Sequence, residues 1–204
     1  MIIHWFPLLC GLFFGLIPPK LLISSECRYL RFEALWKRVL NKEKVRQRRR
    51  RWWKLPLVWI DPMRGYAVAT MIGDAFGASP KAGGIHALFP LMATFLVLFV
   101  VVWVQTSGRQ EQGEILSPSG FLGGMMLALL PLVVALSAIV IGMATAVAMG
   151  RFIPGYLVAT FMTGCIGYLF MGRSLWLMAY TVLVATPMLL SWLRRSSLVV
   201  PVRS

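Results

Sequence analysis

The sequence has few acidic residues, few histidines and few cysteines, and these shortages limit its chemistry. Only 7 of the 204 residues are Asp or Glu and only 2 are His, so little material exists for a catalytic or metal site. The three cysteines, Cys10, Cys27 and Cys165, are far apart and lack ligand spacing, which indicates neither a disulfide framework nor a metal site. We therefore expect no cofactor and no metal.

Motifs of known catalytic and transport sites are also missing. The chain lacks the multi-aspartate, glycine-spaced pattern with which alcohol phosphotransferases hold divalent metal, and it lacks HExxH, GxSxG, CxxC and a phosphate loop. Secondary carriers commonly contain an internal repeat that relates two halves of the chain, and this sequence has none. An enzymatic function is without support in the sequence.

Apolar residues are abundant. They make up 58% of the chain while charged residues make up only 14%, against roughly 45 to 50% and about 25% in soluble domains. The stretches Ala82–Ser107 and Leu116–Gly150 carry no charged residue and exceed what a buried soluble helix needs. The composition predicts an all-α, polytopic transmembrane helix bundle.

Five apolar segments are long enough to cross a hydrocarbon core of about 30 Å, which takes about 20 residues. They are Ile2–Ile23, Gly84–Gln105, Gly120–Met149, Phe152–Met171 and Ser174–Trp192. In a cleaved signal peptide a basic region precedes the apolar run. The first segment has no such region before it, so we interpret it as a retained anchor. The third is long enough to tilt, and Pro131 can bend it.

The segment Leu55–Ser79 is interrupted by charge, and we expect it to form a short re-entrant or interfacial helix. Asp61 followed by Pro62 is a typical helix start, since the carboxylate accepts from first-turn amides and proline has none to leave unpaired. A helix from Pro62 to Gly77 would be roughly 24 Å long, which is short of a full crossing.

The basic residues then fix an orientation. The net charge is +14, and Glu26–Lys54 alone carries twelve basic and three acidic residues. If Leu55–Ser79 does not cross, nineteen of the 21 Lys and Arg lie in the cytoplasm, and Arg109 and Arg173 lie outside with Glu111 and Glu114. If it does cross, the tail arginines are exported. We therefore expect the amino terminus outside and the carboxyl terminus in the cytoplasm, in a bacterial inner membrane.

A basic amphipathic helix is predicted after Ser24, with Tyr29, Phe32 and Trp36 on its apolar face. Such a helix can lie on an anionic leaflet or on the protein's own cytoplasmic surface. Four arginines and two tryptophans follow, and they suit phosphates and the headgroup level. This lipid-binding or partner-binding set consists of Arg48, Arg49, Arg50, Arg51, Trp52 and Trp53. No RNA- or DNA-binding pattern accompanies them, so nucleic acid is the less favoured partner.

These readings divide the chain into five regions. They are a membrane anchor at 1–24, a basic amphipathic cytoplasmic segment at 25–54, an interfacial or re-entrant helix region at 55–83, a four-helix transmembrane region at 84–193 and a basic cytoplasmic tail at 194–204.

Few ionisable groups fall at membrane depth, where an unpaired charge is costly and a polar residue is a functional candidate. The candidates for an intramembrane polar site are Asp61, Arg64, Asp74 and His86. Asp61 and Arg64 are close enough to pair, and a capped helix start explains them better than catalysis does. Asp74 and Arg64 lie about 15 Å apart along a helix and cannot pair directly.

Small residues recur at four-residue steps, which allows close helix packing in a bilayer. The longest such run is Gly155, Ala159, Thr163 and Gly167. Shorter runs are Gly142, Ala146 and Gly150, and Gly11 with Gly15. The runs support packing within the chain, or against a protein partner or a second copy.

Two functional hypotheses remain. The first is a non-enzymatic accessory, assembly or scaffold subunit of a membrane complex, whose basic cytoplasmic segment binds anionic phospholipid. The alternative is a small transporter or lipid-processing enzyme, which would need Asp61, Arg64, Asp74 and His86 to converge on a hydrated cavity.

Overall fold

The computed structural model describes residues 2–17, 27–30, 56–77, 88–107, 114–194 and 197–203. Within these ranges the chain is almost entirely helical, as expected, with two small sheets added. The helices are α1 (Trp5–Leu16), α4 (Pro56–Ala75), α5 (Leu88–Ser107), α6 (Ser119–Leu129), α7 (Leu132–Met149), α8 (Phe152–Met171) and α9 (Leu175–Leu193).

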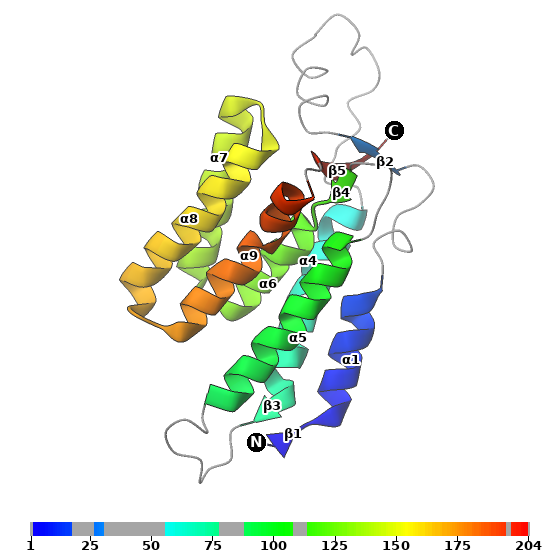
Figure 1. The fold of residues 1–204 in the computed structure, drawn as a ribbon, viewed down its shortest axis with the longest axis vertical. Coiled ribbons are helices and arrows are strands. Elements are labelled where there is room, and N and C mark those ends of the chain that lie inside the picture. The colour runs from blue at the N-terminus through cyan, green and yellow to red at the C-terminus, as the bar shows by residue number, and fades with distance from the viewer. Residues whose placement is uncertain are drawn as a thin grey trace, which may run out of the picture.

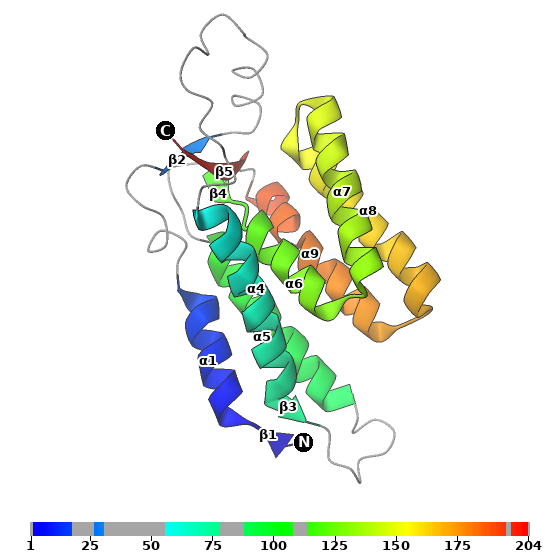
Figure 2. The same cartoon turned by 180° about the vertical axis from the view of Figure 1, so that it is seen from behind.

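The helices form two groups joined by α9 (Figure 1). In the first group α4 packs between α1 and α6, and α5 lies beside α1 and α4; in the second α7 and α8 form an antiparallel hairpin. Helix α9 contacts both α5 and α8. The view from behind places α4 and α6 side by side and shows the two chain ends at opposite ends of the bundle (Figure 2).

Four of the described helices, α5, α7, α8 and α9, are long and apolar enough to cross a membrane. Their large apolar side chains point outward as well as inward: Leu169 is 80% exposed and Trp192 is 77% exposed. Lipid tails solvate such side chains where water would not. The predicted segments Gly84–Gln105, Phe152–Met171 and Ser174–Trp192 correspond closely to α5, α8 and α9.

The predicted single helix Gly120–Met149 is wrong, because the chain reverses direction inside it. Leu130 is extended (φ −114°, ψ 155°) and separates α6 from α7. The residue before a proline is pushed toward extended backbone, and Pro131 has no amide with which to continue α6. Gly123 of α6 consequently lies beside Ile139 of α7, so the two helices form a V-shaped hairpin instead of one tilted rod.

Helix α4 begins at Pro56, six residues before the predicted start at Pro62, which lies inside it. Pro56 is suited to a first helical position, because proline has no amide to leave unpaired there. The 20 residues measure about 30 Å, which equals a hydrocarbon core. Val68 and Ile72 are fully buried, so α4 is a core helix of the bundle and does not lie flat against its surface.

Short strands tie the chain ends to the bundle. Strand β1 (Ile2–Ile3) pairs antiparallel with β3 (Phe76–Gly77) beside the amino terminus. A second sheet has the order β2-β5-β4, where β2 is Cys27–Leu30, β5 is Ser197–Arg203 and β4 is Glu114–Leu116. We call the end of the bundle with this second sheet the sheet end.

The second sheet corrects two expectations. Residues 27–30 form a strand antiparallel to Val200–Arg203, so the amphipathic helix predicted from Ser24 does not include them. The valine-rich tail suits strand pairing, and this long-range partner overrides the local helical pattern. The rest of that predicted helix, and the end of the predicted segment Ile2–Ile23 beyond residue 17, lie outside the described residues.

Two helix pairs approach so closely that only glycine fits. A Cβ added at Gly65 of α4 would overlap the Phe121 carbonyl of α6, and one added at Gly124 of α6 would overlap the Pro62 carbonyl of α4. In the other pair, Gly142 of α7 and Gly155 of α8 meet in the same way. Close backbone contact of this kind drives helix association where the hydrophobic effect gives no help.

Adjacent glycines in α6 provide a test of this packing. Gly124→Ala should destabilise the protein by about 1 to 3 kcal/mol, because its Cβ would meet backbone. Gly123→Ala is the matched control, since its Cβ would lie 3.8 Å from the Ile139 side chain and alanine favours the helix. Unfolding in detergent, followed by tryptophan fluorescence, should separate them. Equal unfolding midpoints for the two variants would contradict the α4–α6 contact.

Candidate functional site

Asp61 and Arg64 form a buried ion pair on one face of α4. The Nη2 atom of Arg64 donates a hydrogen bond to Asp61 Oδ1 at 2.7 Å. The Arg64 side chain is only 5% exposed and the Asp61 side chain only 16% exposed. Their spacing of three residues places them on neighbouring positions of one helical face. The expected pairing of these two residues therefore exists, and its surroundings explain what it does.

The cationic side of the pair caps α1. Arg64 Nη1 donates to the Ile17 carbonyl at 2.6 Å, where α1 ends. From α5, the Gln105 amide donates to the same carbonyl at 2.9 Å and also to the Gly15 carbonyl. The last four carbonyls of any helix lack partners within it, and α1 has no basic residue in its own last turn. Two neighbouring helices therefore supply that cap.

The anionic side of the pair caps α6. Asp61 Oδ2 accepts from the Phe121 amide at 3.1 Å, and Phe121 is the third residue of that helix. An N-cap side chain makes the same bond, but the residue before α6 is Pro118, which has no group to do so. A negative charge at a helix start and a positive one at a helix end both complement the helix dipole.

We call Asp61, Arg64, Gln105 and Phe121 the capping network. It caps one end of each of the two shortest described helices, α1 with 12 residues and α6 with 11, which measure only about 18 and 16 Å. The Arg64 guanidinium carbon also lies 4.8 Å from the centre of the Phe121 ring, a favourable distance for a cation and an aromatic face. Both Asp61 oxygens and both terminal Arg64 nitrogens have protein partners.

The other predicted polar residues do not join this network. Asp74 is exposed and lies ten residues beyond Arg64, about 15 Å along α4. His86 lies outside the described residues, as do Arg48 to Arg51 with Trp52 and Trp53. Among the described residues, no three His, Cys, Asp or Glu side chains come close enough to hold a metal ion.

The predicted run of small residues in α8 faces two different helices. Gly155 and Ala159 lie against Gly142 of α7. Thr163 is buried, and its hydroxyl donates to the Ala159 carbonyl of its own helix at 2.8 Å. Gly167 lies against Leu177 of α9. Within the described chain this run serves internal packing.

Gln105 is not among the site residues that the sequence predicts. Its amide makes three of the contacts in the capping network, although in the sequence it stands only at the end of an apolar segment. Counting amides along with ionisable groups inside apolar runs would have found it. The Phe121 amide had no signal in the sequence, because a backbone group becomes a partner only through the fold.

The chain matches no protein-family model, and no curated protein and no solved structure is significantly similar to it.

Single substitutions in the ion pair should cost stability. Asp61→Asn or Arg64→Gln should each lower the free energy of unfolding by about 3 kcal/mol, because each leaves the other charge buried without its partner. The double variant should lose less than the sum of the two. Asp74→Asn removes an exposed carboxylate and should change the free energy by less than about 0.5 kcal/mol. Denaturant titration in micelles measures all four variants, and additive losses would contradict the coupling.

Proposed function

We propose that this protein is a non-enzymatic accessory or assembly subunit of a membrane complex, held by anionic phospholipid at its basic cytoplasmic segment. The proposal rests on the hydrogen bonds of Asp61 and Arg64, which pair with each other and cap two helix ends. Both carboxylate oxygens and both terminal guanidinium nitrogens are used, and Arg64 Nε alone among the polar side-chain atoms of the pair has no partner. A site for transport or catalysis keeps its polar groups available to a substrate. Here the buried charges are used to close helices, so they serve the architecture.

The comparison with broken-helix transporters supports the same choice. In those proteins, half-helix ends near the bilayer midplane point at the substrate and at coupling ions. In this chain the end of α1 and the start of α6 are occupied by Arg64, Gln105 and Asp61. Asp74 is also too far away to share a cavity with them. The convergence that a transporter or lipid enzyme would need is not favoured by this geometry.

The charge distribution supports a cytoplasmic sheet end. Thirteen of the 21 Lys and Arg lie between Ile17 and Pro56, which both belong to that end, and Arg194 and Arg203 lie there too. Basic loops prefer the cytoplasm. The proposed orientation has the amino terminus outside and the carboxyl terminus inside, and it is the same if α4 crosses the membrane. The reversal between α6 and α7 adds the turn that returns the tail to the cytoplasm.

Single thiols test this topology in a background with Cys10, Cys27 and Cys165 replaced by Ser. Single cysteines that replace Arg46, Glu114 or Arg151 should all be protected from an impermeant thiol reagent in intact cells and should react after permeabilisation. Arg173→Cys, in the turn at the opposite end, should react from outside. One tilted helix over Gly120–Met149 instead predicts external labelling of Glu114→Cys. That result would overturn the arrangement.

Lipid retention tests the proposed role of the basic segment. Replacing all four arginines from Arg48 through Arg51 by Gln should reduce the anionic phospholipid that co-purifies with the full chain in mild detergent. Each basic residue near a charged leaflet contributes roughly 1 kcal/mol to binding. Arg194→Gln with Arg195→Gln is the control for lost charge elsewhere. Unchanged lipid content in the fourfold variant would contradict the role of this segment.

Partner capture and turnover assays separate the two functional classes. Asp74→Asn should keep its folded yield and the same stoichiometric co-purifying protein as the parent chain. If this variant instead loses a transport or lipid-turnover activity at unchanged yield, the transporter or enzyme hypothesis replaces the accessory one.

A further inference from the structure

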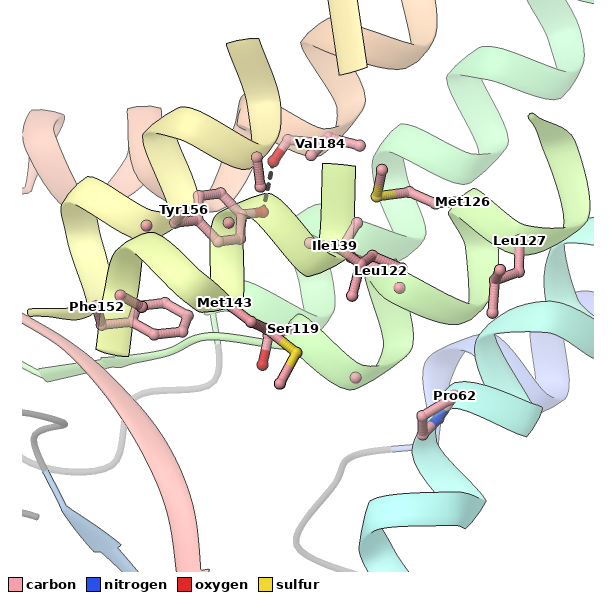
Figure 3. Close-up of a pocket in the computed structure, with 16 residues that line it drawn as sticks. Pro62, Ser119, Leu122, Met126, Leu127, Ile139, Met143, Phe152, Tyr156 and Val184 are labelled. Atoms are coloured by element: carbon pink, nitrogen blue, oxygen red, sulfur yellow. Dashed lines mark hydrogen bonds between the residues drawn. The ribbon is translucent and has the colours of Figure 1, made fainter. Parts of the chain in front are cut away.

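A cavity of about 430 Å³ lies between α6, α7 and α8 (Figure 3). This volume falls within the range of small-molecule sites. Leu122 and Met126 contribute from α6, Ile139 and Met143 from α7, and Tyr156 from α8. Ser119, Met143 and Phe152 gather at one end of the cavity in Figure 3.

Backbone packing on both sides keeps this cavity open. Helix α6 is held against α4 by the glycine contacts at Gly65 and Gly124, while α7 is held against α8 at Gly142 and Gly155. The turn at Leu130–Pro131 joins the two helices only at one end. Since each arm of the V is fixed to a different neighbour, the space between them cannot close without breaking one of those contacts.

The interior of the cavity suits an apolar chain. The Tyr156 hydroxyl lies within it but already donates to the Val184 carbonyl at 2.5 Å, so it has no need of a ligand (Figure 3). The two methionines are flexible side chains that adapt to irregular apolar partners. A polar ligand buried here could replace few of its hydrogen bonds to water, since Ser119 is the one other lining residue with a polar side chain.

A basic residue is next in the chain to a residue that lines the cavity. Arg151 is exposed, precedes α8 and donates its backbone amide to the carbonyl of Ala146, a lining residue, at 3.2 Å. Phe152, the next residue, also lines the cavity. Within the described ranges no carboxylate pairs with Arg151. An arginine side chain is a favoured partner of phosphate.

We propose that this cavity binds one acyl chain of an anionic phospholipid, with the lipid phosphate on Arg151. The cavity supplies the apolar recognition and the guanidinium supplies the charge complementarity, a combination that distinguishes a phospholipid from a partner helix. The proposal uses none of the residues Arg48 to Arg51 and does not depend on the proposed accessory function. Its lipid would wedge the α6–α7 hairpin against α8.

Photo-crosslinking of the full-length protein tests the site. The probe is phosphatidylglycerol with a diazirine in its acyl chain, supplied in phosphatidylcholine nanodiscs. Adducts should concentrate on the lining segments of α6 and α7, and Gly123→Leu should abolish them by filling the cavity. Gly164→Leu is the matched control, since its Cβ also lies 3.8 Å from a side chain but faces α9 instead. Met143→Trp blocks the cavity from the opposite wall if Gly123→Leu does not fold.

A comparison of two lipid head groups tests the role of Arg151 in binding the phosphate. Arg151→Gln should reduce the preference for the phosphatidylglycerol probe over the matching phosphatidylcholine probe by about fivefold, as loss of roughly 1 kcal/mol gives. Adducts spread evenly over the outward faces, or unchanged by both blocking variants, would overturn the proposal. Equal labelling by the two probes in the parent chain would overturn its anionic part.

Discussion

The Asp61–Arg64 pair is the interaction on which the arrangement of four helices depends. Its two charges stand on one face of α4, and each closes the end of a different short helix. A helix that ends inside a bundle leaves backbone groups that neither lipid nor apolar side chains can satisfy. One ion pair meets that need at a helix end and at a helix start, with the sign that each dipole prefers. Without the pair, the start of α6 would lose the Asp61 bond to Phe121 and the end of α1 would keep only the bonds from Gln105.

Two short helices are therefore tolerated where a bilayer protein would normally require full-length ones. Helix α6 can end after 11 residues because Asp61 caps its start and the turn at Pro131 ends it. Its early end lets α7 return toward the sheet end. The hairpin reverses the chain once more and leaves a space that α8 borders but does not fill. Capping, topology and cavity are thus consequences of the same break.

The break also reconciles the charge distribution with a core α4. Counted as one helix, Gly120–Met149 forces a choice between an interfacial α4 and an exported basic tail. Counted as a hairpin, it allows α4 to run the length of the bundle while Arg194 and Arg203 stay at the end where α4 begins. The number of crossings that a charge count implies therefore depends on whether a long apolar run contains a reversal.

The sequence by itself determined the helical class, the pairing of Asp61 with Arg64, and three of the four described helices that are long enough to cross a membrane. Composition, run length and three-residue spacing are local properties, so they can be read without the fold. Tertiary structure alone decided that Gln105 and the Phe121 amide complete the network, that residues 27–30 pair with the tail, and that the bend expected at Pro131 is a full reversal of the chain. Each of these depends on which segments become neighbours. The close approach at Gly65 and Gly124, for example, makes α4 and α6 neighbours, and it appears only in the fold.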